Sequence, residues 1–213
     1  YIDDLETATV IEQFTNPGQA DILSTDNIYV VGDSITAGAN SYYQAEARDR
    51  NVQVTLNGQN SRALSGGTGK DGFTTIEEDK AVIADVGVIV VALGTNPSSD
   101  FADQLPAFVQ RLKAINSRAA IYWVDLAGHQ DADEAGLSAR NRIIHDQAGP
   151  QGYHVIPWFK TVFPAGDPFN ISETLNDDKD YIRNDAYDVH PSTTGYEAYV
   201  NLVLSNVIKP INR

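Results

Sequence analysis

The chain has 213 residues, 42% of them hydrophobic, which is enough for one domain with a substantial core. Its net charge of -14, from 15 Lys and Arg against 29 Asp and Glu, would repel phosphate backbones and anionic lipid surfaces, so we expect no nucleic-acid partner. The absence of cysteine excludes disulfides and thiolate metal sites, and no apolar run approaches the roughly 20 residues that span a bilayer.

From residue 27 onward, short apolar runs alternate with segments of helical periodicity, which is typical of repeated βα units around a parallel sheet. A capping box, Ser41 with Gln44, indicates that the first helix covers residues 42–50, and apolar spacing predicts helices over 101–115 and 196–207. Five strands are expected, at residues 28–31, 52–56, 86–93, 119–126 and 153–157. We therefore predict a flavodoxin-like three-layer α/β/α sandwich with a five-stranded parallel sheet.

The segments outside this pattern are interpreted from their composition. Residues 1–26 are acidic and contain the turn signal Asn16-Pro17-Gly18, so we expect a linker or peripheral N-terminal segment, and a single domain over residues 27–213. Residues 158–183 exceed the usual loop length, and either a solvated excursion or a substrate-facing flap fits them. The chain starts without a methionine or a signal segment, which favours a piece of a longer protein.

A serine stands at the end of the first predicted strand, in Gly32-Asp33-Ser34. Such residues are common in ordinary loops, but a serine on a sharp strand-to-helix turn can also act as a nucleophile. Two later segments favour chemistry: Gly94-Thr95-Asn96 follows the third strand, and Asp188-Val189-His190-Pro191 precedes the last helix. Ligands of an open parallel sheet bind beyond the carboxyl ends of its strands, so Ser34 and Asn96 are expected at one edge.

Together and in this order, the three segments resemble the signature blocks of the SGNH (GDSL-type) hydrolase family, from about residue 27 to about residue 206. The resemblance implies that Ser34 is the nucleophile of an acyl transfer and that His190 is its general base. The backbone amide of Ser34 and the side chain of Asn96 would donate hydrogen bonds to the oxyanion. No cofactor and no metal is expected.

The third oxyanion donor of the family is a backbone amide in the loop after the second strand, usually that of a glycine. Arg62 aligns Ser61 with that glycine, and Gly58 is the alternative. A backbone donor needs no particular side chain, so either amide could serve.

The triad carboxylate departs from the family pattern, which places an aspartate three residues before the histidine, where this chain has Tyr187. Asp188 is our first choice because it keeps the order Ser, Asp, His, and Asp185 is the alternative. A dyad is also physically feasible, because a backbone carbonyl can hold the tautomer of His190.

Within the family, the chain looks like the extracytoplasmic domains of peptidoglycan or polysaccharide O-acetyltransferases and acetylesterases. The likeness lies in Ser61-Arg62, in Val155-Ile156-Pro157-Trp158, and in His190-Pro191-Ser192 with Gly195. This likeness implies a serine esterase or O-acyltransferase that acts on a small acyl ester, by preference acetyl, of a carbohydrate. An extracytoplasmic, monomeric domain, tethered to a membrane-embedded parent protein, would fit. Arg62, Tyr43 and Trp158 would contact the substrate.

Two other functions use the same strand ends. A flavodoxin-like module would bind a flavin or nucleotide there, although the phosphate-loop-like run Gly66-Gly67-Thr68-Gly69-Lys70 lacks a preceding strand. A catalytically silent carbohydrate-binding domain would explain the displaced aspartate and the aromatic residues Tyr42, Tyr43 and Trp158.

Overall fold

The computed structural model describes residues 10–14 by their backbone, and residues 27–67, 69–129, 136–171, 179–184 and 189–208 in full. Six strands form one sheet in the order β1-β3-β2-β4-β5-β6. They are β1 (Val10–Phe14), β2 (Asn27–Gly32), β3 (Gln53–Gly58), β4 (Val88–Ala92), β5 (Ala120–Val124) and β6 (His154–Ile156). The five strands from β2 to β6 are parallel, which confirms the predicted sheet.

The sheet also has an antiparallel edge strand that the sequence analysis did not predict. β1 pairs with β3 from Val10 opposite Gly58 to Phe14 opposite Val54. It lies within the segment that we expected to be a linker or peripheral cover, where the acidic composition and the turn signal hid a short strand. An edge strand needs only one neighbour, so its sequence pattern is weak.

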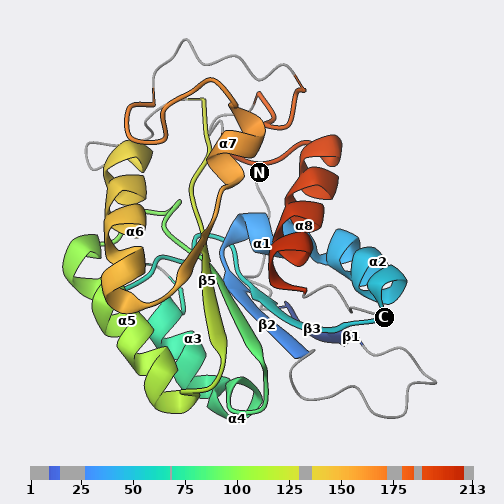
Figure 1. Ribbon diagram of the computed structural model, residues 1–213, viewed down its shortest axis with the longest axis vertical. Coiled ribbons are helices and arrows are strands. Elements are labelled where there is room, and N and C mark those ends of the chain that lie inside the picture. The colour runs from blue at the N-terminus through green and yellow to red at the C-terminus, as the bar shows by residue number, and fades with distance from the viewer. Residues whose placement is uncertain are drawn as a thin grey trace, which may run out of the picture.

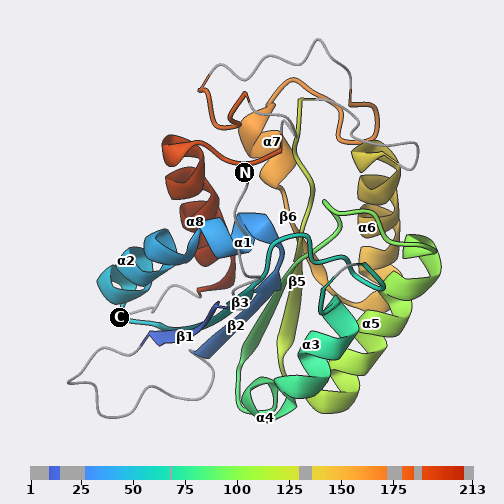
Figure 2. The same cartoon turned by 180° about the vertical axis from the view of Figure 1, so that it is seen from behind.

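The helices cover both faces of the sheet (Figures 1 and 2). One face carries α1 (Ser34–Gly38), α2 (Asn40–Arg50) and α8 (Thr193–Val207), and the other carries α3 (Gly72–Glu78), α4 (Lys80–Ile83), α5 (Phe101–Ile115) and α6 (Leu137–Gln151). A short helix, α7 (Trp158–Val162), follows β6 within the segment that showed no period. Among the described residues, none of the helices has the length and apolarity that a membrane span requires.

The predicted capping box is wrong. α2 begins at Asn40, so Ser41 lies inside its first turn, and the N-cap residue, Ala39, makes no side-chain cap. Gln44 instead donates to the Asn40 side chain, with 3.4 Å between Nε2 and Oδ1. Only Ala39 separates α2 from α1, and its amide donates to the carbonyl of Ile35, so the chain enters α2 from a preceding helix.

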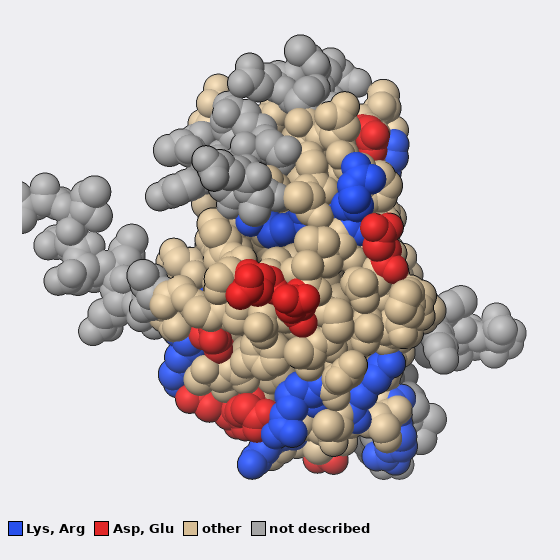
Figure 3. Space-filling view, turned by 90° about the vertical axis from the view of Figure 1, so that its left-hand side faces the viewer, with Lys and Arg blue, Asp and Glu red and all other residues tan. Residues whose placement is uncertain are grey.

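The core lies on both sides of the central strands. All five residues of β4 are buried, as a central parallel strand requires. Trp123 of β5 is fully buried, and its indole N–H donates to the carbonyl of Leu93 at 2.9 Å. On the α5–α6 side, acidic and basic side chains lie in small alternating groups (Figure 3). Arg111 of α5 forms an ion pair with Glu77 of α3.

Strand order fixes where a ligand can approach. The chain passes from β2 outward to β3 and then returns to the other side of β2 to form β4. The connections after β2 and β4 therefore leave the sheet in opposite directions, and the carboxyl ends of these two strands form the switch point of the fold. Ser34 follows β2 and Asn96 follows β4, so both predicted residues stand at this point.

Candidate active site

The nucleophile turn, residues 32–34, joins β2 directly to α1. Asp33 is the N-cap of α1, and its Oδ1 accepts a hydrogen bond from the Ile35 amide at 2.9 Å. Gly58, at the end of β3, lets α1 cross over the sheet, because a Cβ there would lie 2.4 Å from the backbone nitrogen of Ala37. This close crossing places Ser34 as the first helical residue at the carboxyl edge of the sheet.

Ser34 and His190, which are far apart in sequence, meet at this edge. The Ser34 Oγ lies 3.0 Å from the His190 Nε2, and both residues are half-buried. Two backbone hydrogen bonds fix the segment before α8: Arg183 N donates to His190 O at 2.9 Å, and Ser192 N donates to Tyr181 O at 2.8 Å. The distance between Ser34 Oγ and His190 Nε2 lies within the range at which a general base can take the proton of a hydroxyl.

Two aspartates are the candidates for the carboxylate partner of His190. Asp188 and its alternative, Asp185, both fall outside the described residues, as does Tyr187.

The predicted oxyanion donors lie on two loops that contact each other. Asn96, which is half-buried, donates from Nδ2 to the carbonyl of Arg62 at 3.1 Å. The loops also meet at two serines, where Ser65 N donates to Ser98 Oγ at 3.0 Å and the two hydroxyl oxygens lie 2.8 Å apart. The sequence analysis missed this serine pair, because serines in glycine-rich loops carry no distinctive signal.

The two candidates for the third donor differ in their surroundings. Ser61 is exposed, and its φ of 59° is in the left-handed region that favours glycine. This conformation gives a physical reason for the glycine that the family has at this position. Gly58 is buried against α1, so its small size serves the crossing of that helix.

The three predicted substrate contacts are corrected by their burial. Tyr43 is fully buried in α2, and Trp158 and Arg62 are each 1% exposed. None of them offers a surface to a carbohydrate. Tyr43 and Trp158 belong to the core, where apolar rings are expected, and Arg62 is enclosed by hydrogen-bond acceptors of its own loop.

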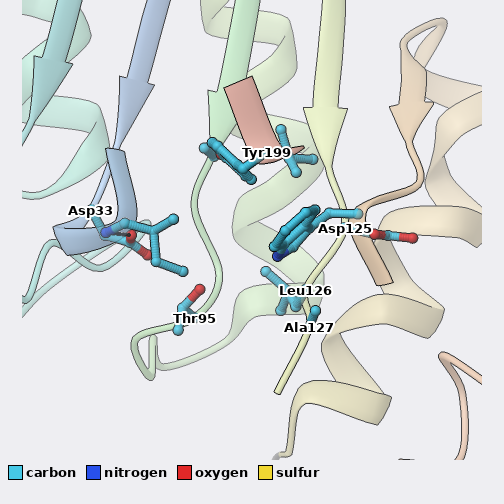
Figure 4. A pocket seen from close by; sticks show the side chains of 10 residues that line it. Asp33, Thr95, Asp125, Leu126, Ala127 and Tyr199 are labelled. Atoms are coloured by element: carbon cyan, nitrogen blue, oxygen red, sulfur yellow. Dashed lines mark hydrogen bonds between the residues drawn. The ribbon is translucent and has the colours of Figure 1, made fainter. Parts of the chain in front are cut away.

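A small cavity lies behind the nucleophile turn (Figure 4). It has a volume of about 10 Å³, counted as space open to the centre of a water molecule, which is about what one water needs and less than an acyl group. Its lining includes Asp33, Thr95, Asp125 and Trp158. Within the described residues, Asp33 Oδ2 and Trp158 Nε1 make no hydrogen bond.

The two carboxylates of this cavity have perturbed acidity. Burial raises the pKa of Asp33 from 3.8 to about 6, although the Ile35 amide, the Thr95 side chain and the charge of Arg62 act in the opposite direction. Burial also raises the pKa of Asp125, whose carboxylate contacts His145 Nε2 at 3.1 Å and accepts from the Phe159 amide at 2.7 Å. Over the parts of the chain that the structure describes, no three His, Asp or Glu side chains gather as a metal site would require.

A parallel sheet with a hydrogen-bonded serine and histidine at its switch point is the arrangement of a serine hydrolase. The sequence model of the GDSL-like Lipase/Acylhydrolase family matches residues 30–198, and the chain belongs to this family. It is therefore an acyl ester hydrolase. A comparison with curated proteins gives no match.

Several solved structures share the fold. The acetyl xylan esterase AlAXEase has a TM-score of 0.64 at 16% identity, over 85% of this chain and 100% of that one. Axe2-W215I, an acetyl xylan esterase from Geobacillus stearothermophilus, has a TM-score of 0.60 at 13% identity, over 88% of this chain and 97% of that one. A member of the lipolytic protein G-D-S-L family from Veillonella parvula has a TM-score of 0.58 at 17% identity, over 84% of this chain and 96% of that one. At such identities the likeness shows the fold alone.

Proposed function

We propose that this protein cleaves or transfers a small acyl group, by preference acetyl, from an ester of a carbohydrate through a covalent acyl-Ser34 intermediate. The observation that carries the proposal is the 3.0 Å contact between Ser34 Oγ and His190 Nε2 at the switch point of the sheet. Membership of an acylhydrolase family supports the reaction class and speaks against a flavin-binding or catalytically silent module.

The chemistry follows from this pair. His190 takes the proton of the Ser34 hydroxyl as Ser34 Oγ bonds to the ester carbonyl carbon, and the carbonyl π electrons move to the carbonyl oxygen. The tetrahedral intermediate collapses, the C–O bond to the alcohol breaks, and His190 gives its proton to the leaving oxygen. Water, or the hydroxyl of an acceptor sugar, then attacks acyl-Ser34 with His190 again as base, and Ser34 regains its proton. Hydrolysis and transfer differ only in this second nucleophile.

The oxyanion needs donors aimed at the developing charge, and removal of one such donor typically costs about 10²- to 10³-fold in rate. We assign this role to the backbone amides of Ser34 and Ser61 and to the side chain of Asn96. Their loops are connected by the hydrogen bond from Asn96 to Arg62 O and by the contact between Ser65 and Ser98. We assign the triad carboxylate to Asp188.

The preference for acetyl and for carbohydrate is supported by the structures that share the fold, which include acetyl xylan esterases. Soluble acetylated oligosaccharides and cell-wall glycans lie outside the cytoplasmic membrane, so we propose an extracytoplasmic site of action.

The decisive experiment compares hydrolysis of p-nitrophenyl acetate by the wild type, Ser34→Ala and His190→Ala. We expect each substitution to lower kcat by at least about 10³-fold, because neither member of such a pair works alone. Ser41→Ala and His154→Ala are matched controls, since both residues are exposed and lie away from the strand ends that hold the site. Unchanged rates in both site variants would refute the nucleophile and base assignment.

The substrate preference needs its own comparison. We expect kcat/KM for p-nitrophenyl acetate to exceed that for p-nitrophenyl octanoate, and acetate release from acetylated xylo-oligosaccharides to require Ser34. Transfer is separated from hydrolysis by adding unacetylated xylo-oligosaccharide and following acetylated products by mass spectrometry. A preference for octanoate would contradict the small acyl group while leaving the serine mechanism intact.

A further inference from the structure

Arg62 is buried at the base of the oxyanion loop, the name used below for residues 57–71, and every N–H of its guanidinium is used. Nη1 donates to Gly32 O at 2.8 Å and to Asn57 O at 2.7 Å. Nη2 donates to Asn57 Oδ1 at 2.9 Å and to Gln59 Oε1 at 3.1 Å, and Nε donates to Lys70 O at 3.3 Å. A guanidinium has five N–H groups, so this set of acceptors satisfies it completely.

These acceptors come from two separate parts of the fold. Asn57, Gln59 and Lys70 stand near the two ends of the oxyanion loop, whereas Gly32 is the last residue of β2, two residues before Ser34. The Gln59 amide also donates to Gly32 O at 3.2 Å. The guanidinium therefore closes the oxyanion loop and attaches it to the strand that leads into the nucleophile turn.

The backbone of the same residue reaches the third part of the site. The carbonyl of Arg62 accepts the hydrogen bond from Asn96 Nδ2 at 3.1 Å. Ser61, whose amide is a candidate donor, is the preceding residue. One residue thus touches or adjoins each of the three segments that supply oxyanion donors.

The charge of Arg62 is compensated through a buried network and not through a direct ion pair in the described structure. Asp79 Oδ2 accepts from Tyr29 OH and from Asn57 Nδ2, each at 2.6 Å, and Asn57 in turn accepts from Arg62. Burial lowers the pKa of Arg62, while the nearby carboxylates of Asp79 and Asp33 act against this. A buried charge is weak evidence for stability, since well-packed apolar residues often stabilise as much, so the network calls for another reason.

We propose that Arg62 is a positioning residue that holds the nucleophile turn, the oxyanion loop and Asn96 in the mutual geometry that the tetrahedral intermediate requires. This inference rests on the proposed function. The planar guanidinium of Arg62 reaches acceptors both on β2 and on the oxyanion loop, which the single ammonium of a lysine cannot do. Displacement of an oxyanion donor by about 1 Å can cost on the order of 10²-fold in rate.

The test measures kcat and KM for p-nitrophenyl acetate in Arg62→Lys and Arg62→Met, together with urea unfolding. We expect kcat to fall about 10- to 100-fold in both variants, with KM within about threefold of the wild type, because the geometry of the intermediate is disturbed more than the binding of substrate. The matched control is Asn116→Ala. Asn116 is also buried and makes five hydrogen bonds to backbone, but it lies at the amino-terminal edge of the sheet, before β5.

The control separates positioning from stability. Asn116→Ala is expected to lower stability as much as Arg62→Lys while leaving kcat within about twofold. The inference would be overturned if Asn116→Ala lost as much kcat as Arg62→Lys, or if Arg62→Lys kept the wild-type kcat. The proposed function would still stand in either case, provided that turnover by the wild type depends on Ser34. A wild type without Ser34-dependent turnover would overturn the proposed function and this inference together. If Arg62→Met does not fold, Gln59→Met, which removes one acceptor of the fork, should lower kcat a few-fold at constant KM.

Discussion

Neutralising Asp33 should change how stability depends on pH. Asp33→Asn keeps an oxygen that can accept from the Ile35 amide and removes a charge that is fully buried. The pKa of Asp33 is about 6 in the folded protein and the ordinary 3.8 in the unfolded chain, so between these values the folded state binds more protons. The contribution of Asp33 to stability therefore falls as pH rises through this window, and the loss is complete above it.

The magnitude follows from the same two values. Ionisation of Asp33 between pH 5 and pH 8 costs about 1.4 kcal/mol, one pKa unit being worth about that much. Urea unfolding, followed by the fluorescence of the buried Trp123 and Trp158, measures the free energy of unfolding at both pH values. We subtract the free energy of unfolding of Asp33→Asn from that of the wild type. This difference should be about 1.4 kcal/mol less favourable to the wild type at pH 8 than at pH 5. Parallel pH profiles for the two proteins would refute the reasoning.

The remaining predictions concern the backbone of the site. Ser61→Gly should raise the free energy of unfolding by up to about 1 kcal/mol, because a φ of 59° strains a residue with a Cβ; a lower urea midpoint would contradict this. Gly58→Ala should lower both stability and kcat, because its Cβ would meet the backbone of Ala37 and displace α1. Gly149→Ala is the control, since apart from its chain neighbours a Cβ there meets nothing within 4 Å, and we expect it to leave kcat unchanged.

Much of this fold could be predicted from the sequence because its signals are local. An apolar run such as Val88 to Ala92 is typical of a strand that is covered on both faces, and the alternation of such runs with helical segments predicts parallel neighbours. The placement of Ser34 and Asn96 at one edge could be anticipated because both follow strands of a parallel sheet. The pairing of Ser34 with His190 was implied by the family resemblance.

What could not be predicted depends on partners that are distant in sequence. Arg62 was expected to contact the substrate, whereas the structure surrounds it with carbonyls of β2 and of its own loop. Tyr43 and Trp158 suggested a glycan-binding surface, but both pack in the core. A periodic pattern shows that a ring is apolar and does not show which neighbours cover it.

The central claim is that Ser34 carries the acyl group. The most direct measurement is mass spectrometry of the intact protein and of its peptides after reaction with a fluorophosphonate, which phosphonylates an activated serine. We predict a single adduct on the peptide that contains Ser34, and no adduct in Ser34→Ala or His190→Ala. An adduct on another residue, or equal labelling of Ser34 in His190→Ala, would contradict the claim that this pair forms the nucleophile and its base.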